Sequence, residues 1–594
     1  MGIASRLLPW GTVLAVHRSN RPMVVGDCRD RPVIDKAGRA ARVVLLGHAL
    51  IDEDTVLDYV RSIDSAARWR AVLGAIDGSF HSVVELNGDI YVHGSAYGSR
   101  SLYRSRVDGI DIAADTVHAL KHLVSARLDV GALAAHLLEP VPHHLAQRPL
   151  LDGIEPVPPG AGLVIAPRGM SLLVRDKPER ALIRDLDAGA HEVRSRLVGA
   201  VSARTAAGGT VTSELSGGYD STSISFLAAR GPAEIKLLTA RGRDSANEDL
   251  EWALRAAGHM PEVEHTILPD SELPFTYAGL HDGPTWLNEP SPLIAGRSRV
   301  GALARLASTF GPSVHLTGHG GDHLFTGAPA RYRDLLWRRP FTAWRGLRGY
   351  GALGGWRLRD LIYDSVEPAG YHSWWKKNSR PVAGVPEKRK PVLGWAIIPS
   401  VPVWATATAE KAIREGIAWM ASATDPLARQ RGSHFELETI IEGARTVAVL
   451  NRISLAAGGP PLAAPYFDDR VISAALSVAV QHRVSAWTYK PLLSASVRGI
   501  VPDVVLRRQT KDDGSHDVEN GLRKHRDELV ALWEGSRLGD LGLIDSKKLK
   551  QLCANPSSFE LEEGTMYTTI ACELWLRDLE RSFVAPRNGS AVQR

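Results

Sequence analysis

The chain has 594 residues, of which 44% are hydrophobic and 23% charged, a composition typical of a globular protein with roughly two to four domains. Its 71 Lys and Arg residues against 66 Asp and Glu give a formal net charge of +5, which is too small for so large a surface to indicate a nucleic-acid partner. The three cysteines, Cys28, Cys553 and Cys572, form no C-x-x-C pair, so neither a disulfide framework nor a structural zinc site is supported.

Hydrophobic runs are short throughout the chain. None approaches the roughly eighteen consecutive apolar residues of a membrane span, so no span is expected. The apolar run at 7–16 contains Pro9 and Trp10 and lacks a clear small-residue cleavage site, which argues against a secretory signal. We therefore expect a cytoplasmic protein, and the low cysteine content fits a reducing compartment.

The first part of the chain, residues 1–175, contains short β-rich segments. Residues 43–46, 80–86 and 90–93 have the apolar and β-branched content of strands, and turn residues at 87–89 join the last two. This pattern predicts a largely antiparallel α+β domain.

Strands and helices alternate in the remainder of the chain. A charged, proline-containing stretch suggests a linker over 176–190. Apolar strands are expected at 210–215, 235–240 and 313–317. The alternation predicts an α/β domain over 191–594, whose parallel sheet is covered by helices on both faces and binds ligands at the carboxyl ends of its strands.

The first of these strands runs into the segment SGGYDS at 216–221, and a helix is expected to follow. Two glycines let the backbone approach a ligand closely, and the first-turn amides of a helix point at an anion placed there. The segment therefore predicts a pyrophosphate cradle, in which Asp220 supplies a carboxylate for Mg2+. A bare SGG tripeptide is more often an ordinary turn, but the strand before it and the helix after it favour the cradle.

A second glycine turn, TGHGGDHLF at 317–325, follows the third predicted strand. Because ligands of such sheets lie at the carboxyl ends of the strands, the two turns would bring Asp220 and Asp322 to one site. The pair predicts a site for a nucleotide and Mg2+.

The segment at about 328–435 differs in composition from the rest of the chain. Between 331 and 414, tryptophans alternate with many Lys and Arg; they are Trp337, Trp344, Trp356, Trp374, Trp375, Trp395 and Trp404. Interleaved basic and aromatic residues can bind single-stranded nucleic acid by stacking or a flexible peptide by aromatic anchoring. The alternative is a helical subdomain whose tryptophans are core and whose Lys and Arg are solvated.

The two glycine turns, with PYFDDRV at 465–471 and RQTK at 508–511, resemble the ATP pyrophosphatase domain of asparagine synthetases and β-lactam synthetases in order and spacing. The histidine in TGHGGD, the R-x-T-K segment and the enlarged insertion are most similar to the lasso-peptide macrolactam cyclases of actinobacteria. The N-terminal region resembles, more weakly, the glutaminase-like (Ntn-type) domain of asparagine synthetases. That domain uses a cysteine after the initiator methionine, where this chain has Gly2, so glutamine hydrolysis is not expected.

The resemblance implies ATP and Mg2+ as ligands of an adenine nucleotide alpha-hydrolase-like domain. The metal would bind Asp220 and Asp322. The nucleotide would contact Leu215, Ser216, Gly217, Gly218, Asp220, Ser221, Ala240, Thr317 and Gly318. Lys511 matches the family lysine that contacts the acyl phosphate, and Lys490 matches a second lysine whose role is less defined.

The attacking amine must lose a proton, and β-lactam synthetases use a tyrosine paired with a glutamate for this. The tyrosine position is His319 here; an imidazole can accept a proton near neutral pH, although it can equally bind pyrophosphate or cap a helix. The glutamate position falls near 449–451, where no residue is acidic. Glu442, two helical turns earlier, can substitute if that segment is one helix.

These features predict an AMP-forming carbon–nitrogen ligase that adenylates an Asp or Glu side chain of a ribosomal core peptide and joins it to the peptide's N-terminal amine. The expected partners are the precursor peptide, a leader peptidase and a leader-binding protein, without nucleic acid. One alternative is a β-lactam synthetase-like enzyme that makes a small amide. The other is a peptide- or nucleic-acid-binding module with a degenerate nucleotide site, against which the intact Asp220 and Asp322 argue.

Overall fold

A computed structural model describes residues 2–7, 11–28, 32–174, 182–244, 247–383, 390–508, 515–555 and 563–581. Part of the predicted linker at 176–190 lies outside these residues, and helix α7 (Leu186–Thr205) already begins within its predicted bounds. The Asp185 carboxylate starts this helix by accepting the Ala188 amide at 2.8 Å. In the described part of the chain, no helix has the length and apolar content needed to cross a lipid bilayer.

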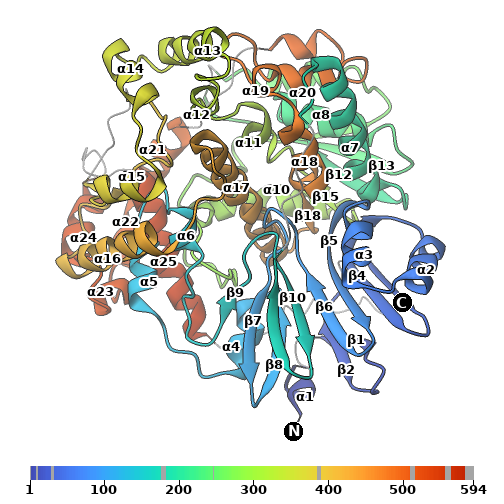
Figure 1. Cartoon of the computed structure of the whole chain (residues 1–594). Helices are drawn as coiled ribbons and strands as arrows, with labels where there is room; N and C mark the ends of the chain where they lie inside the picture. The colour runs from blue at the N-terminus through green and yellow to red at the C-terminus, as the bar shows by residue number, and fades with distance from the viewer. Residues whose placement is uncertain are drawn as a thin grey trace.

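Antiparallel sheets form the N-terminal region (Figure 1). Among the described residues the largest sheet has six strands, in the order β11-β10-β6-β5-β4-β3. Its strands are β3 (Val33–Ala37), β4 (Ala41–Leu50), β5 (Asp77–Leu86), β6 (Asp89–His93), β10 (Gly162–Ala166) and β11 (Gly169–Leu173). The smaller sheets contain β1 (Thr12–Val16), β2 (Pro22–Gly26), β7 (Tyr103–Val107), β8 (Ile110–Ala114) and β9 (Glu155–Pro156). The predicted antiparallel strands are confirmed.

Both faces of the six-stranded sheet are covered, which explains the uninterrupted apolar run at 43–46. Val43 and Leu45 pack with Trp69 under α2 (Glu53–Ser62) and α3 (Ala66–Leu73). Val44 belongs to the core on the other face, with Ala15 of β1. Because successive side chains of a strand point to opposite faces, a strand covered on both sides needs an apolar residue at each position.

The second region contains a parallel sheet. Its five described strands have the order β14-β13-β12-β15-β18, and each adjacent pair is parallel. They are β12 (Thr210–Glu214), β13 (Glu234–Ala240), β14 (Glu264–Leu268), β15 (His315–Leu316) and β18 (Leu462–Ala463). The predicted parallel sheet is confirmed, and β12, β13 and β15 match the three predicted strands.

Helices surround this sheet and join it to the N-terminal region (Figure 1). They include α8 (Tyr219–Ala228), α9 (Asp249–Ala257), α10 (Arg297–Ser308), α11 (Gly321–Phe325), α17 (Arg431–Ala456), α18 (Asp469–Ser477), α19 (Val480–Arg483) and α20 (Pro491–Ser496). At the junction with α18, Asp469 accepts the Ala96 amide at 2.7 Å, and Arg470 pairs with Asp77 at 3.1 Å. These bonds fix β5 and the 95–100 loop against α18.

The Trp-rich insertion is helical. It contains α12 (Ala330–Arg333), α13 (Pro340–Leu353), α14 (Leu358–Val366), α15 (Tyr371–Lys377) and α16 (Ala407–Ala423). Trp374, Trp375, Trp395 and Trp404 are buried in the largest core of the molecule. Trp337 and Trp344 are exposed. Thus the core interpretation is correct for four of the seven tryptophans and wrong for Trp337 and Trp344, while Trp356 is half-buried.

That largest core also contains residues of helices before and after the insertion. These helices are α4 (Val117–Leu123), α5 (Val130–Ala135), α6 (His143–Ala146), α22 (Arg526–Leu532), α23 (Arg537–Asp540), α24 (Ser546–Ala554) and α25 (Glu563–Glu580). Helix α16 packs against α5, so the insertion is anchored on the N-terminal region.

Candidate functional site

The first glycine turn connects the end of β12 to α8. Gly217 has φ +79°, and a Cβ there would lie 2.8 Å from the Ala253 amide nitrogen, so the position requires glycine. Gly218, at the N-cap of α8, has no side chain that could occupy the first-turn amides. The Ser216 amide donates to Ser221 Oγ at 3.0 Å. The turn therefore presents the start of α8 to an anion, while the Ser216 amide already has a partner within the turn.

The second glycine turn lies directly against the first. A Cβ on Gly318 would lie 2.7 Å from Ser221 Cα, and one on Gly321 would lie 2.8 Å from Asp220 Cβ. Tyr466 supports the contact by donating its hydroxyl to the Asp220 carbonyl at 3.2 Å. The two turns meet because β12 and β15 are neighbours in the sheet.

Asp220 and Asp322 share one cation, the ammonium of Lys490. Its Nζ lies 2.6 and 2.5 Å from the two carboxylate oxygens of Asp220 and 2.8 Å from Asp322 Oδ1. Lys490 is 2% exposed and has a left-handed backbone, with φ +43°, just before α20. Burial alone would lower the pKa of this ammonium, but the charges of Asp220 and Asp322 raise it above its ordinary value.

The two carboxylates fit a magnesium ion that is bound together with phosphate. Both reach a single positive centre, the position that Lys490 Nζ occupies. Among the described residues, no group of three or more His, Cys, Asp or Glu could hold a metal ion by itself. Mg2+ is commonly held by one or two carboxylates plus phosphate oxygens. Asp220 and Asp322 would therefore hold this ion only with oxygens from a nucleotide.

Three of the residues predicted to contact the nucleotide lie at the ends of adjacent strands. Leu215 directly follows β12, and Ala240 ends the neighbouring β13. Thr317 follows β15, where its amide donates to the Ala463 carbonyl at 3.0 Å and its hydroxyl donates to Glu214 Oε2 at 2.6 Å. These positions share the carboxyl edge of the sheet, beside the two glycine turns.

His319 is turned toward α17. Its Nε2 lies 2.6 Å from Thr446 Oγ1, and its amide donates to Thr317 Oγ1 at 3.3 Å. The ring centroid is 5.4 Å from that of His323 and 5.3 Å from that of Phe467. The imidazole is thus held in an aromatic cluster against α17.

Helix α17 also carries two acidic residues, at four-residue intervals before Thr446, which contacts His319. Because it is a single helix of 26 residues, Glu442 lies one turn before Thr446 and Glu438 one turn earlier still. Desolvation, together with the charge of Glu442, raises the pKa of Glu438 to about 7, although the His143 amide donates to Glu438 Oε1 at 2.8 Å. Glu442 is exposed to solvent, yet the surrounding protein desolvates it enough to raise its pKa despite the charge of Arg445.

Glu442 and the position of the family glutamate near 449–451 lie on one helix, as the substitution of Glu442 for that glutamate requires. Sequence patterns do not reveal Glu438, because its environment includes His143, which is 295 positions away in the chain. The only local signal is the spacing of four residues between the two glutamates.

Lys511, predicted to contact the acyl phosphate, lies outside the described residues. Residues 506–508, shortly before it in the chain, are among the described residues. Arg508 is buried and forms an ion pair with Asp249 of α9, and the Tyr219 hydroxyl donates to the Leu506 carbonyl. Since the Gly217 turn packs against α9, these bonds hold the 506–508 segment beside the first glycine turn.

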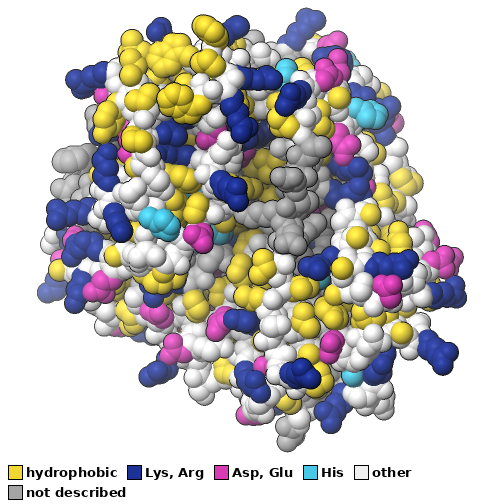
Figure 2. Space-filling view, viewed as in Figure 1, with side chains coloured by type: hydrophobic (Ala, Val, Ile, Leu, Met, Phe, Trp, Pro, Cys, Tyr) yellow, Lys and Arg dark blue, Asp and Glu magenta, His cyan; other side chains and the backbone are white. Residues whose placement is uncertain are grey.

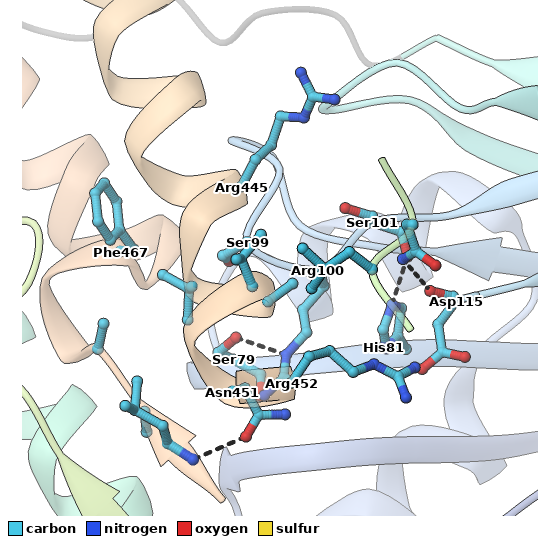
Figure 3. A pocket seen from close by; sticks show the side chains of 18 of the residues that line it. Ser79, His81, Ser99, Arg100, Ser101, Asp115, Arg445, Asn451, Arg452 and Phe467 are labelled. Atoms are coloured by element: carbon cyan, nitrogen blue, oxygen red, sulfur yellow. Dashed lines mark hydrogen bonds between the residues drawn. The ribbon is translucent and has the colours of Figure 1, made fainter. Parts of the chain in front are cut away.

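A polar cavity of about 80 Å³ lies between the N-terminal region and α17 (Figure 3). Arg445 forms an ion pair with Glu289 there, and Arg204 pairs with Asp468 through bonds of 2.5 and 2.7 Å. Segment 447–449 and Asn451, which include the position of the family glutamate, also line it. The sequence does not predict this cavity, because its walls come from distant segments of the chain.

The family model described as asparagine synthase matches residues 192–577, more than half of the chain. Among curated proteins, amidase chyE of Penicillium rubens is 28% identical over 281 residues. The match covers 42% of this chain and 39% of the amidase.

Two solved structures also match, each at 10% sequence identity and a TM-score of 0.18. One is the allosteric regulatory enzyme of purine biosynthesis; the match covers 42% of this chain and 64% of that enzyme's chain. The other is the glutamine phosphoribosylpyrophosphate amidotransferase from B. subtilis; the match covers 50% of this chain and 58% of that enzyme's chain. A TM-score this low supports no inference about the fold.

Proposed function

Because the chain belongs to the asparagine synthase family, we propose that it is an ATP-dependent ligase that joins a carboxylate to an amine and releases AMP and pyrophosphate. One observation supports this most: two glycine turns are in contact, and their aspartates, Asp220 and Asp322, converge on one buried cation. A carboxylate is a poor acyl donor at neutral pH, and adenylation turns one of its oxygens into a leaving group. Converging amides and cations are what stabilise the departing pyrophosphate.

Each group of the site has a role in this reaction. The amides at the start of α8 donate to the pyrophosphate oxygens. Asp220 and Asp322 would hold Mg2+, which neutralises phosphate charge when bound. Lys490 limits the repulsion between these two carboxylates. Lys511, by the family resemblance, stabilises charge on the acyl phosphate.

We assign removal of the amine proton to the acidic face of α17. Glu438 and Glu442 lie on the helix that contacts His319, and a base with a pKa of about 7 is matched to neutral pH. His319 is the second candidate, because its Nε2 is held by Thr446, one turn along α17 from Glu442. The substitution that removes the pH dependence of amide formation, at Glu438 or at His319, identifies which of the two is the base.

For the substrate, we propose a ribosomal peptide that is closed into a macrolactam between an Asp or Glu side chain and its own N-terminal amine. The TGHGGD turn, the R-x-T-K segment and the enlarged insertion support this choice by their similarity to lasso-peptide cyclases. The proposal includes a cytoplasmic setting, a leader peptidase that frees the amine and a leader-binding protein that delivers the precursor.

ATP–pyrophosphate exchange tests the proposal directly. The purified protein is incubated with ATP, Mg2+ and synthetic linear peptides that carry a free N-terminal amine and one internal Asp or Glu. Exchange, together with a product lighter than the peptide by one water, supports the peptide ligase. Exchange with free β-amino acids but not with peptides would instead support the small-molecule alternative. Absence of exchange with every carboxylate would contradict the ligase assignment.

A further inference from the structure

Large aromatic side chains lie uncovered on the insertion. Trp337 is 90% exposed and Phe341 is 91% exposed, while Trp344 on the next turn of α13 is also exposed. Figure 2 shows hydrophobic side chains gathered over α13 and α14, with Lys and Arg among them. Aromatic residues of this size are usually at least partly buried, and contiguous exposed apolar surface commonly marks an interaction site.

The packing of α13 explains why these side chains face outward. The inner face of the helix is made of small and aliphatic residues, among them Ala343, Gly346 and Leu347, all buried. A Cβ on Gly346 would lie 2.7 Å from Tyr332 Cγ, so the helix is pressed closely onto α12. This close approach leaves no room for bulky residues on the inner face, and they occupy the outer one.

The outer face of α13 and the segment that leads into it are also strongly basic. Arg338, Arg339, Arg345 and Arg348 are exposed around the aromatic residues. Segment 335–359 contains six arginines and no acidic residue. Segment 470–502, which supplies the neighbouring Trp487, has no acidic residue either. An anionic ligand would therefore meet little repulsion along this surface.

This surface continues to the candidate site. The Arg345 guanidinium lies 5.0 Å from the Trp487 ring centroid, and a Cβ on Gly349 would lie 2.7 Å from the same ring. Two residues later, the Tyr489 ring is 5.2 Å from Lys490 Nζ. Exposure falls along this path, from 57% at Trp487 to 38% at Tyr489 and 2% at Lys490. We call the surface formed by Trp337, Phe341, Trp344, Arg345, Trp487 and Tyr489 the aromatic track.

We propose that the aromatic track binds an extended, acidic segment of the substrate peptide outside the part that is cyclised. This inference rests on the proposed function. An extended chain can follow a surface that descends from fully exposed aromatics to a buried lysine, whereas a flat bilayer could contact only the outer part. A nucleic acid could follow the track but offers no carboxylate to the site at its end, which favours a peptide. Aromatic side chains and arginine are typical anchors for such a partner.

Fluorescence anisotropy with defined probes tests the track. The probe is a labelled synthetic peptide that contains several Glu residues and a Tyr, and its comparison is the same peptide with Gln in place of Glu. Trp337→Ala/Phe341→Ala should weaken binding of the acidic peptide at least about 10-fold. The Gln peptide should bind more weakly to the wild type, and added salt should reduce the difference.

A matched control is available on α16. Trp419 is 43% exposed and has the Arg148 guanidinium 5.5 Å from its ring centroid, so it is an aromatic–arginine pair away from the track. Trp419→Ala should leave peptide affinity unchanged. Arg345→Glu, a charge reversal at an exposed position, should weaken binding without affecting the fold, as circular dichroism can check.

The outcomes separate this inference from the proposed function. Equal affinity of wild type and Trp337→Ala/Phe341→Ala, with ATP–pyrophosphate exchange intact, overturns the track and leaves the ligase. Track-dependent peptide binding without exchange in the wild type supports the track and overturns the ligase. Tighter track-dependent binding of phosphatidylglycerol vesicles or of oligothymidylate than of the acidic peptide overturns the choice of a peptide.

Discussion

The glycine-turn site and the aromatic track belong to one continuous surface but are built in opposite ways. At the site, Gly217 and Gly318 have no space for a methyl group, and Lys490 is enclosed by two carboxylates. On the track, Trp337 and Phe341 extend into solvent. A residue that is enclosed by close neighbours cannot change by even one atom without disturbing them. An exposed side chain can be removed with the loss of its own contact alone. Substitutions should therefore abolish the chemistry at the site and only weaken binding on the track.

The largest effect should come from the aspartates that meet at Lys490. Asp220→Ala or Asp322→Ala should each reduce pyrophosphate release by about 10³-fold. Each change leaves a buried ammonium with less compensation and removes half of the carboxylate pair that could hold Mg2+. Asp64→Ala, at an exposed position on the N-terminal region, is the control. Unchanged release in either variant would refute the shared-cation site.

A smaller loss, with a change in pH dependence, should follow substitution of the α17 acid. Glu438→Gln should lower kcat/KM for amide formation by about 10²-fold while adenylation continues. In the wild type, the raised pKa of about 7 means that the base is protonated below neutrality, so the rate should increase as pH rises through 7. The variant should lose this increase. If Glu438→Gln keeps it and His319→Ala loses it, the base is His319.

The same carboxyl predicts a pH dependence of stability. Its pKa is about 7 in the folded chain against an ordinary 4.5, so the folded state binds its proton more tightly than the unfolded state. This contribution to the free energy of unfolding is present below about 4.5 and is lost as pH rises toward 7. Glu438→Gln should flatten that decline in urea titrations, whereas the exposed Glu415→Gln should not.

An intermediate effect should come from crowding the contact between the two turns. Gly318→Ala places a methyl group 2.7 Å from Ser221 Cα, and the backbone there cannot move aside without separating the turns. We expect a loss of about 1–3 kcal/mol in the free energy of unfolding, measured by urea titration. Gly296→Ala is the control, because a Cβ there meets no atom within 4 Å. Equal stability of both variants would show that the turns are not tightly packed.

The smallest effect should come from the track. Arg345→Ala removes one cation–π contact with Trp487, which is worth about 0.5–1 kcal/mol at an exposed site. Affinity for the acidic peptide should fall by roughly 2–5-fold, measured by anisotropy. Arg61→Ala, on α2, should have no effect. A loss as large as that of the aspartate variants would mean that Arg345 takes part in the chemistry.

Local chemistry made part of the site predictable. The apolar strands at 210–215 and 235–240 carry their own signal, and the glycines at 217 and 318 mark the turns because no other residue fits there. Strands β15 and β18 each have two residues, too few to show a period; β15 is predicted only because it lies within the longer run 313–317, and β18 is not predicted.

Other features depend on contacts that the sequence does not contain. Lys490 reaches Asp220 across 270 positions, and the pKa of Glu438 depends on its tertiary surroundings. Trp375 and Trp337 belong to the same Trp-rich segment, but one is core and the other surface. Their difference arises from packing against distant helices, such as α16 for the buried set.

Helix α17 spans about 39 Å, given its 26 residues. Along this length it contacts the N-terminal region through Arg445, which donates to the Ala146 carbonyl at 3.3 Å, and the second glycine turn through Thr446. It also contacts the edge strand β18 through Asn451, which accepts the Leu462 amide at 2.8 Å. A continuous helix is stiff, so α17 keeps the N-terminal region, the second glycine turn and β18 at fixed distances from one another. Any shift of the second glycine turn must therefore tilt the N-terminal region with it or break one of these contacts, which couples the two regions mechanically.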